Sequence, residues 1–286
     1  MTRTPTLFKA FAWATLALAL GGCMRVWTWG DQAPQSSAPS ASASEQRQQQ
    51  AELAQAALTL APTGVLRVGV YSGSPTSMVT VQGERCGIAL ELGHMLGQQL
   101  GVPVQVVEFE RVAEVVNAVH EGRVDFTFTN ASAERAKRVD FTPTMVRLEL
   151  GVLVPLGSAI QSANDLDRAG LRLGVSQGSS TQAVLGQRLK LTQILPQASL
   201  GVARQALARG ELDAFATNKG ILFELADQLP QYRVLPDAWG HEQLAIAIPQ
   251  GRDQAMPWLQ AWAQTQVQNR QIGTLARRAG LRGLAP

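Results

Sequence analysis

TFTNASAERAKRVDF, residues 127–141, is the stretch that decides the fold. It joins a β-rich run to a helix that opens at Ser132, and Arg135 lies three residues into that helix. Unpaired backbone N–H groups at a helix N-terminus carry the positive end of the helix dipole, and an arginine beside them adds a full charge. The segment therefore predicts either an anion-binding corner or a plain packing corner between a strand and a helix.

Strands and helices alternate around this stretch. Residues 66–70 (LRVGV) and 104–109 have the short apolar pattern of buried strands, and residues 125–129 form the next strand. Between them, apolar residues recur at helical spacing in residues 88–100 and 112–119. This βαβ order predicts an α/β fold with a largely parallel sheet.

Two segments of the chain are repeated in the same order. Residues 120–130 (HEGRVDFTFTN) recur as residues 208–218 (ARGELDAFATN). Residues 66–74 (LRVGVYSGS) recur as residues 171–179 (LRLGVSQGS). Two repeats in register predict two similar α/β lobes.

Two extended apolar runs lie between the lobes, residues 148–156 (LELGVLVPL) and 244–249 (LAIAIP). If the chain crosses through the first and returns through the second, helices near residues 258–267 and 272–279 belong to the first lobe. Paired antiparallel crossings allow the lobes to rotate about a fixed line and close on a ligand. We expect a two-lobed fold with two hinge strands, whose boundaries follow: lobe 1 comprises residues 63–153 plus 246–286, and lobe 2 residues 154–245.

The N-terminal residues 1–23 have the pattern of a signal peptide, with Arg3 and Lys9 before an apolar run. The run ends in Leu-Gly-Gly-Cys, which resembles a bacterial lipobox, and this implies cleavage before Cys23 and lipidation of that residue. Plain secretion is the alternative, and either process exports the protein. We expect a periplasmic or cell-surface protein that is anchored to a bacterial membrane through Cys23.

Residues 24–62 are rich in Ser, Ala, Pro and Gln, and this composition predicts a flexible tether, with a helix from about Glu45 to Leu60 as the alternative. Trp27 and Trp29 could lie at a bilayer interface. Cys86 is then the single cysteine of the folded part, and a buried apolar role fits it better than nucleophilic chemistry.

Composition and histidine spacing exclude several classes of function. The 286 residues are 45% hydrophobic and 16% charged, with a formal net charge of +3 and no long basic run, so nucleic acid is not an expected partner. His94, His120 and His241 stand apart in the sequence, which predicts no metal site and no cofactor.

Ligands of open parallel sheets bind beyond the carboxyl ends of the strands. Four loops satisfy this condition: residues 71–75, 129–135, 176–181 and 217–220. They are rich in Ser, Thr, Asn and Gly, whose small polar groups can approach an anion closely. We expect these loops to face each other across a polar cleft.

The block VDFTFTNASAERAKRVDF resembles the solute-binding proteins of ABC importers for polar amino acids, as do the opening LRVGV, the helix GIALELGHMLGQQLG and the loop VSQGSST. The resemblance extends from about Leu66 to Ala279. It implies a monomeric protein that captures a small polar, carboxylate-bearing solute by lobe closure. The solute would then pass to the membrane subunits of an importer.

The resemblance also implies roles for individual residues. Arg135 would bind the solute carboxylate as a bidentate partner, with backbone donors at Asn130 and Ser180. Hydroxyl, amide, ammonium and aromatic groups at the loop ends complete the expected binding set: Tyr71, Thr129, Ser132, Ser179, Asn218 and Lys219.

The sequence departs from the family pattern at Asn218 and in the loop after the first strand, where the family has an acidic residue and an aromatic wall and this chain has Tyr71 to Pro75. Amino-acid binders place an aspartate at the first of these positions to hold the ligand ammonium. This chain has Asn218 there, followed by Lys219. Tyr71 could form an aromatic wall of the site or belong to the core. With Arg135, Lys219 and no clear carboxylate, the cleft could favour an organic anion over a zwitterionic amino acid.

Two other functions use the same scaffold. A cyclohexadienyl-dehydratase-like enzyme needs a carboxylic acid where this chain has Thr181 and Gln182, and glutamine cannot act as a general acid. A ligand sensor would have to act through a partner receptor. We therefore expect a binding protein and not an enzyme.

Overall fold

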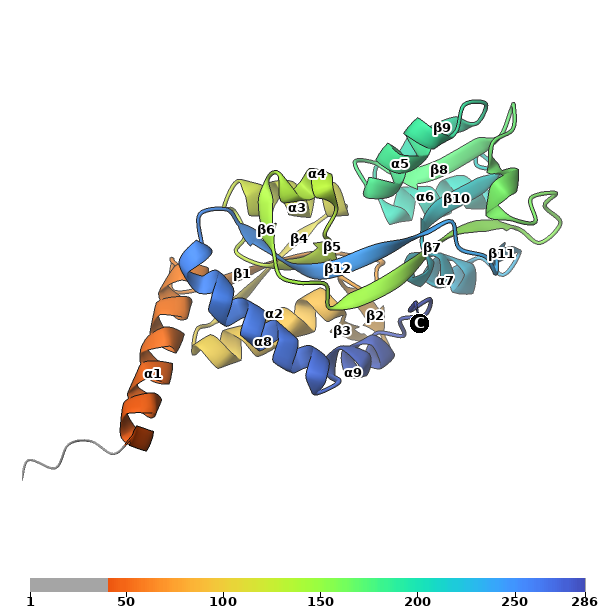
Figure 1. The fold of residues 1–286 in the computed structure, drawn as a ribbon. Coiled ribbons are helices and arrows are strands. Elements are labelled where there is room, and N and C mark those ends of the chain that lie inside the picture. Colours follow the sequence, from red (N-terminus) through yellow and green to blue (C-terminus); the bar gives the residue numbers. More distant parts are fainter. Residues whose placement is uncertain (1–40, 286) are drawn as a thin grey trace, which may run out of the picture.

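The computed structural model describes residues 41–285 of the chain. Two α/β lobes lie along the long axis of the molecule, joined by two long strands, β7 (Val146–Pro155) and β12 (Gly240–Pro249) (Figure 1). β7 carries the chain from lobe 1 into lobe 2, and β12 carries it back. The expected two-lobed α/β fold with two hinge strands is confirmed.

The two hinge strands pair with each other along their first halves only. Val146 to Leu150 of β7 pair antiparallel with Leu244 to Gly240 of β12. Beyond that ladder β7 joins the sheet of lobe 2 and β12 joins the sheet of lobe 1. β12 thus begins four residues before the predicted apolar run, because its polar residues 240–243 are held by ladder hydrogen bonds instead of by burial.

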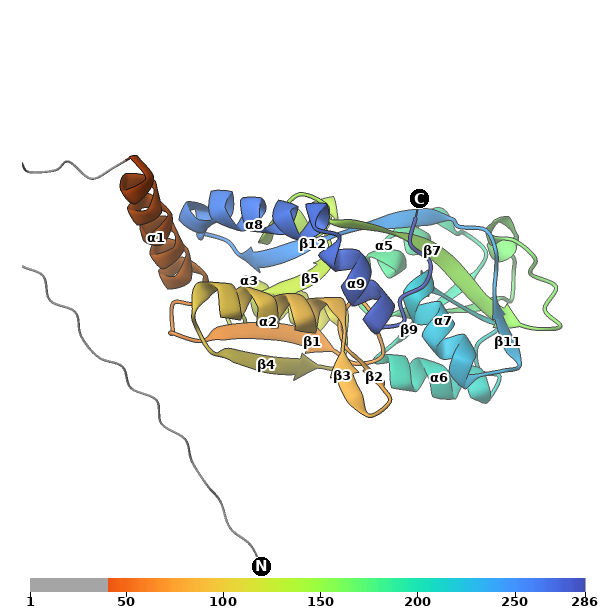
Figure 2. The same ribbon diagram turned by 90° about the horizontal axis from the view of Figure 1, so that it is seen from below.

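Lobe 1 is a sheet with helices on both faces. Helices α3 and α4 lie above the sheet in Figure 1, and α2, α8 and α9 lie below it, as Figure 2 also shows. β1 pairs parallel with β4, as the βαβ order predicts, and Val68 of β1 is bridged to Phe126 just before β5. The elements of this lobe are β1 (Leu66–Tyr71), β2 (Val79–Val81), β3 (Glu84–Cys86), α2 (Ile88–Leu100), β4 (Val104–Phe109), α3 (Val112–His120), β5 (Thr127–Asn130), α4 (Ala133–Ala136), β6 (Val139–Phe141), the 3-10 helix η2 (Asp253–Ala255), α8 (Met256–Gln268) and α9 (Gln271–Arg278).

The C-terminal helices α8 and α9 belong to the core of lobe 1. Leu259 and Trp262 of α8 and Ile272 of α9 pack in one apolar cluster with Leu92 of α2 and Phe128 of β5. The chain therefore returns to its first lobe after completing the second, as the two crossings predict.

In the sheet of lobe 2, β8 lies between β9 and β10 and is parallel to both, while β7 pairs antiparallel with β10. Phe215 of β10 and Leu173 of β8 are fully buried. Its elements are the 3-10 helix η1 (Ala163–Leu166), β8 (Arg172–Ser176), α5 (Ser180–Arg188), β9 (Gln193–Gln197), α6 (Leu200–Ala208), β10 (Ala214–Asn218), α7 (Lys219–Gln228) and β11 (Tyr232–Val234).

The sequence repeats form corresponding ion pairs in the two lobes. The backbone N–H of Arg67 donates to Asp125 at 2.9 Å, and the Arg67 guanidinium binds both carboxylate oxygens. In lobe 2 Arg172 binds Asp213 in the same way, with a backbone distance of 2.8 Å. Each pair ties the first strand of a repeat, β1 or β8, to the residue that leads into β5 or β10.

Residues 41–60, which we assigned to a flexible tether, form helix α1 (Ala41–Leu60), in agreement with the alternative of a helix from about Glu45. Leu53, Ala56, Ala57 and Leu60 recur at helical spacing and pack against the core of lobe 1, and this burial fixes the end of the helix. The expected signal peptide, Cys23 and the two tryptophans at 27 and 29 lie outside the described residues.

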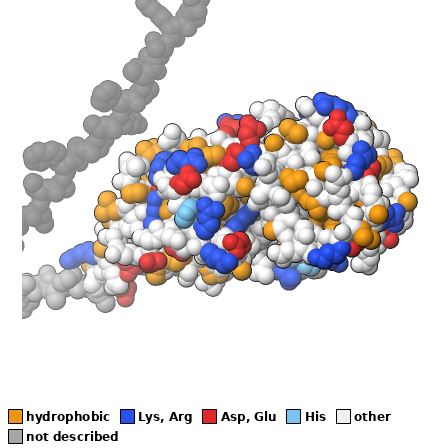
Figure 3. Space-filling view, turned by 90° about the horizontal axis from the view of Figure 1, so that it is seen from above, with side chains coloured by type: hydrophobic (Ala, Val, Ile, Leu, Met, Phe, Trp, Pro, Cys, Tyr) orange, Lys and Arg blue, Asp and Glu red, His pale blue; other side chains and the backbone are white. Residues whose placement is uncertain are grey.

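The described surface carries both signs of charge. On the face shown in Figure 3, Lys and Arg side chains lie intermingled with Asp and Glu. Among residues 41–285, no helix is both long and apolar enough to cross a bilayer.

We predict that Asp125→Asn lowers the free energy of unfolding by about 3–5 kcal/mol, because it leaves Arg67 and Arg252 without their buried counter-ion. Burial alone would raise the pKa of Asp125, but hydrogen bonds from Arg67 and Arg252 outweigh it and lower the pKa. The carboxylate therefore stabilises the fold above its unfolded-state pKa of about 3.9, and this contribution is lost as the pH falls through the lower folded-state value. Urea denaturation at pH 7 and in acid measures the effect.

The matched control is Asp213→Asn, at the corresponding position of lobe 2. Its ion pair is more exposed than that of Asp125, so the control should cost less stability. Equal losses in the two variants would contradict the assignment of Asp125 as the more strongly coupled carboxylate.

Candidate functional site

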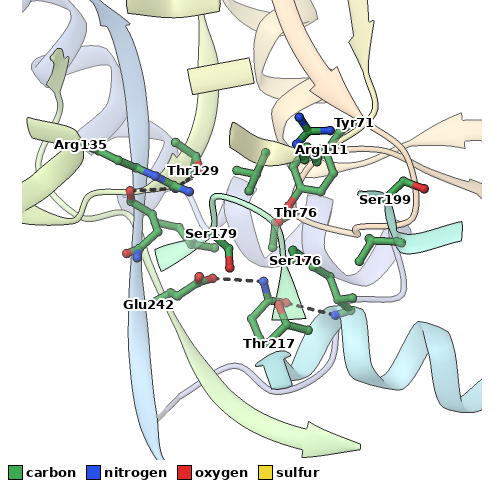
Figure 4. A pocket seen from close by; sticks show the side chains of 16 residues that line it. Tyr71, Thr76, Arg111, Thr129, Arg135, Ser176, Ser179, Ser199, Thr217 and Glu242 are labelled. Atoms are coloured by element: carbon green, nitrogen blue, oxygen red, sulfur yellow. Dashed lines mark hydrogen bonds between the residues drawn. The ribbon is translucent and has the colours of Figure 1, made fainter. Parts of the chain in front are cut away.

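A cavity lies between the two lobes at the carboxyl ends of their strands. Lobe 1 contributes the ends of β1 and β5, lobe 2 the ends of β8 and β10, and the hinge contributes β12 (Figure 4). The volume inside it that is open to water-sized molecules is about 30 Å³. All four predicted loops contribute at least one lining residue: Tyr71, Thr129, Ser176 and Thr217 are examples.

Arg135 is positioned by the turn from β5 into α4. Ser132 caps α4, and its Oγ accepts the backbone N–H of Arg135 at 3.4 Å. The guanidinium Nη1 donates to Thr129 Oγ1 at 2.9 Å and to the Asn130 carbonyl at 3.4 Å. Within the described part of the chain, Nε and Nη2 have no hydrogen-bond acceptor, so Arg135 retains donors for a ligand.

Polar residues of lobe 2 reach the cavity as the N-caps of three helices. Ser179 caps α5 with a 3.1 Å hydrogen bond from Gln182 N, and Ser199 caps α6 with a 3.2 Å bond from Val202 N. Asn218 caps α7, where its Oδ1 accepts the backbone N–H of Ile221 at 3.1 Å. Capping fixes these side chains and directs three positive helix ends toward the cavity.

Glu242 of β12 is a carboxylate in this cavity that the sequence reasoning missed. Its Oε2 accepts a hydrogen bond from Asn218 Nδ2 at 3.1 Å. Burial raises the pKa of Glu242, while the charge of Arg135 and the hydrogen bond from Asn218 oppose the rise. Burial likewise lowers the pKa of Arg135, and Glu242 opposes that change.

Glu242 could not be recognised from the apolar pattern for a physical reason. We began the second crossing at Leu244, where the apolar run starts, and Glu242 lies just before it in the polar half of β12. Residues two apart on a strand share a face, and Leu244 also lines the cavity. Extending the strand by one pair of residues would have placed Glu242 in the cleft.

Six of the nine predicted binding residues line the cavity: Tyr71, Thr129, Asn130, Arg135, Ser179 and Asn218. Tyr71 fills both roles that we left open, because it lines the cavity and also packs in an apolar cluster with Leu200 of lobe 2. Ser132 and Ser180 lie in a neighbouring surface pocket between α4 and α5. Further lining residues that the sequence reasoning did not single out are Thr76, Arg111, Val112, Ser176, Ser199, Leu200, Thr217, Ile221, Glu242 and Leu244.

Lys219 does not line the cavity, contrary to our expectation. Its Nζ donates to Glu149 Oε2 at 2.6 Å and to the Pro236 carbonyl at 2.7 Å. The side chain is held between Gly151 and Gly283, where any larger residue would collide with it. Both premises for an anion-selective cleft therefore fail: the lysine charge is paired elsewhere, and the cavity does contain a carboxylate.

The histidines and Cys86 are the remaining candidates that the sequence raised. Among residues 41–285, no group of three His, Cys, Asp or Glu side chains is arranged to hold a metal ion. Cys86 is buried, and burial raises the pKa of its thiol. This favours the apolar role that we assigned to it.

Residues 66–280 match the family of bacterial extracellular solute-binding proteins, family 3. The match covers most of the chain, so the protein belongs to this family, and the resemblance inferred from the sequence is confirmed.

Individual relatives are more distant. The ABC transporter glutamine-binding protein of Bacillus subtilis is 29% identical over 42% of this chain and 43% of its own length, so the match spans less than half of that relative. A solved solute receptor for L-cysteine from Neisseria gonorrhoeae is 23% identical, with a TM-score of 0.70, over 82% of this chain and all of the receptor. An ancestral amino acid-binding protein, described as a precursor of cyclohexadienyl dehydratase, has a TM-score of 0.67 at 23% identity over 78% of this chain and 98% of its own. At these identities the two solved structures support the fold alone.

We predict that Lys219→Met lowers the free energy of unfolding by about 1–3 kcal/mol and leaves solute affinity unchanged, because the ammonium stabilises Glu149 and not a ligand. Urea denaturation and calorimetry measure the two effects. The control is Lys137→Met, which breaks an exposed pair with Glu134 and should change stability little. Loss of solute affinity without loss of stability would contradict this role for Lys219.

Proposed function

We propose that this protein is an extracytoplasmic solute-binding protein that captures a small carboxylate-bearing amino acid and delivers it to an ABC importer. The observation that carries the proposal is the arrangement of Arg135. Its guanidinium is fixed on one side by Thr129 and Asn130, and its other N–H groups face a cavity between two lobes. A planar guanidinium with free paired donors fits a carboxylate.

The identity of the solute class is supported by relatives. Two relatives that match part of the chain are named as glutamine-binding proteins, and glutamine is an amino acid with a free carboxylate. Three helix N-termini directed at the cavity add partial positive charge on the lobe 2 side and favour the same group.

Lobe closure is part of the proposal, and contacts across the cleft support it. Arg111 of lobe 1 donates to the Ala198 carbonyl of lobe 2 at 3.2 Å. Gly178 of lobe 2 lies against Ala113 of lobe 1 so closely that a Cβ at Gly178 would be 2.6 Å from that of Ala113. A cavity volume of about 30 Å³ admits about two or three water molecules. An amino acid therefore enters when the lobes separate, and its contacts with both lobes favour their closure.

The N-terminal sequence and the family support a proposal for where the protein works. We propose that residues 1–23 direct export and that Cys23 carries a lipid anchor, so that the monomer works at the outer face of a bacterial membrane. The importer subunits would then recognise the closed form.

A second candidate function is elimination on a carboxylate-bearing substrate, as in a dehydratase. It is favoured by Glu242, a carboxyl group of raised pKa in a cavity that also contains Arg135. At the position where the sequence comparison placed the acid, Gln182 instead accepts a hydrogen bond from Gly178 N. Incubation with prephenate and arogenate, followed by chromatography, tests this candidate, and we expect no turnover.

We predict that at least one of the twenty L-amino acids raises the melting temperature of the purified protein and binds in calorimetry. Arg135→Ala should weaken that binding by about 100-fold or more, because it removes two charge-assisted hydrogen bonds of about 1.5–3 kcal/mol each. The control is Arg138→Ala, which removes an exposed arginine bonded to Asn117 and should bind as the wild type does. Unchanged affinity of the Arg135 variant would contradict the proposal.

Closure is tested by Ala113→Trp, which places a bulky side chain where lobe 1 meets Gly178. We predict that small-angle X-ray scattering shows the wild type contracting on addition of its amino acid, whereas the variant stays extended and binds more weakly. Ala113→Ser is the control and should contract. A variant that contracts and binds like the wild type would show that these lobes do not need to approach at this point.

A further inference from the structure

Glu242 is the one acidic residue among the described residues that line the cavity. It lies on β12, opposite Leu148 of β7, in the part of the ladder where the two hinge strands pair with each other. The carboxylate is therefore carried by the hinge itself and not by a loop of either lobe. The backbone of Glu242 is fixed by strand pairing, and its side chain lines the cavity.

The carboxylate of Glu242 has an unused acceptor. Asn218 donates to Oε2, and Oε1 has no hydrogen-bond donor in residues 41–285. No Lys or Arg of that range forms an ion pair with it, although the charge of Arg135 opposes the rise of its pKa. The hydrogen bond from Asn218 and the charge of Arg135 compensate only in part for the hydration that this carboxylate loses in the cavity. This arrangement is stable when a cation from outside supplies the missing partner.

Asn218 is a weaker acceptor for a cation than Glu242, because its amide carries no charge. Its Oδ1 already caps α7, and its Nδ2 is a donor that points to Glu242. Both ends of the amide are thus engaged, and their combined effect is to orient the Glu242 carboxylate. Asn218 is a positioning residue in this arrangement.

Arg135 and Glu242 present opposite charges to one cavity. Their charges interact, but within residues 41–285 the two side chains form no ion pair with each other. Leu244, two residues beyond Glu242, pairs with Asn130, whose carbonyl accepts a hydrogen bond from Arg135. The strand register therefore places the two charged groups near one another. Figure 4 shows both side chains reaching the cavity from different elements. A solute with a carboxylate and an ammonium group a few bonds apart would satisfy both.

We propose that Glu242 accepts the ammonium group of the solute while Arg135 binds its carboxylate, so that the site selects a zwitterionic α-amino acid over an organic acid without an amine. The hinge carboxylate thereby replaces the acidic side chain that is missing after β10, where the chain has Asn218. This inference rests on the proposed function, because it assumes that Arg135 binds a carboxylate.

The test is a two-by-two comparison of protein and ligand. The amino acid that stabilises the wild type most in the panel of twenty is paired with its 2-hydroxy analogue, which replaces the amine by a hydroxyl group. Calorimetry then measures both ligands with the wild type and with Glu242→Gln. We expect the variant to lose about 30-fold or more in affinity for the amino acid, because it loses a charge partner in a desolvated site. Its affinity for the hydroxy analogue should stay within about 3-fold of the wild-type value.

The controls separate local from general effects. Glu149→Gln alters the other hinge carboxylate, which pairs with Lys219 and does not line the cavity, and it should keep wild-type affinity for the amino acid. Melting curves establish whether Glu242→Gln is folded. If it is not, Glu242→Asp replaces it and should give an intermediate loss of affinity for the amino acid.

Two results would overturn the inference and leave the proposed function standing. If Glu242→Gln binds the amino acid as tightly as the wild type does, the carboxylate does not hold the ammonium, while the proposed function survives. If the wild type binds the hydroxy analogue and the amino acid equally, the site does not select for the amine. Binding of no amino acid to the wild type would instead refute the proposed function and, with it, this inference.

Discussion

The pairing of β7 with β12 is the constraint on which the rest of the structure depends. Five residues of each strand form one antiparallel ladder, and each strand then continues into the sheet of a different lobe. The same ladder joins the lobes, defines the line about which they can rotate, and carries Glu242, which lines the cavity. A change of register by one residue would turn Glu242 away from the cavity, since neighbouring residues of a strand face opposite sides.

The cavity combines fixed groups from three sources. Lobe 1 supplies Arg135, which Thr129 and Asn130 hold in place. Lobe 2 supplies helix caps, among them Asn218, and the hinge supplies Glu242. Because each group is oriented by hydrogen bonds within its own element or with the hinge, little order remains to be gained on binding. A site of this kind favours a small polar solute with charges of both signs.

The repeats and the periodicity of the sequence predicted the fold well, because both reflect local physics. The pairs Arg67–Asp125 and Arg172–Asp213 occupy corresponding positions in the two repeats. Arg135 and its supporting residues could be predicted for the same reason, since they all lie in the seven residues 129–135. The positions of Glu242 and Lys219 could not be predicted in this way. Glu242 is placed by strand pairing with distant residues, and Lys219 is held away from the cavity by Glu149, 70 residues away. Helix α1 was predicted only as an alternative, because its last turns are stabilised by packing on α2 and α8, far along the chain.

The account has one central claim: Arg135 and Glu242 bind the two ends of one solute. A crystal structure of the protein with the amino acid that it binds tests this most directly. The account predicts the carboxylate of that amino acid on the Arg135 guanidinium and its ammonium within hydrogen-bond distance of a Glu242 carboxylate oxygen. An ammonium group directed away from Glu242, or a solute bound outside the cavity between the lobes, would contradict it.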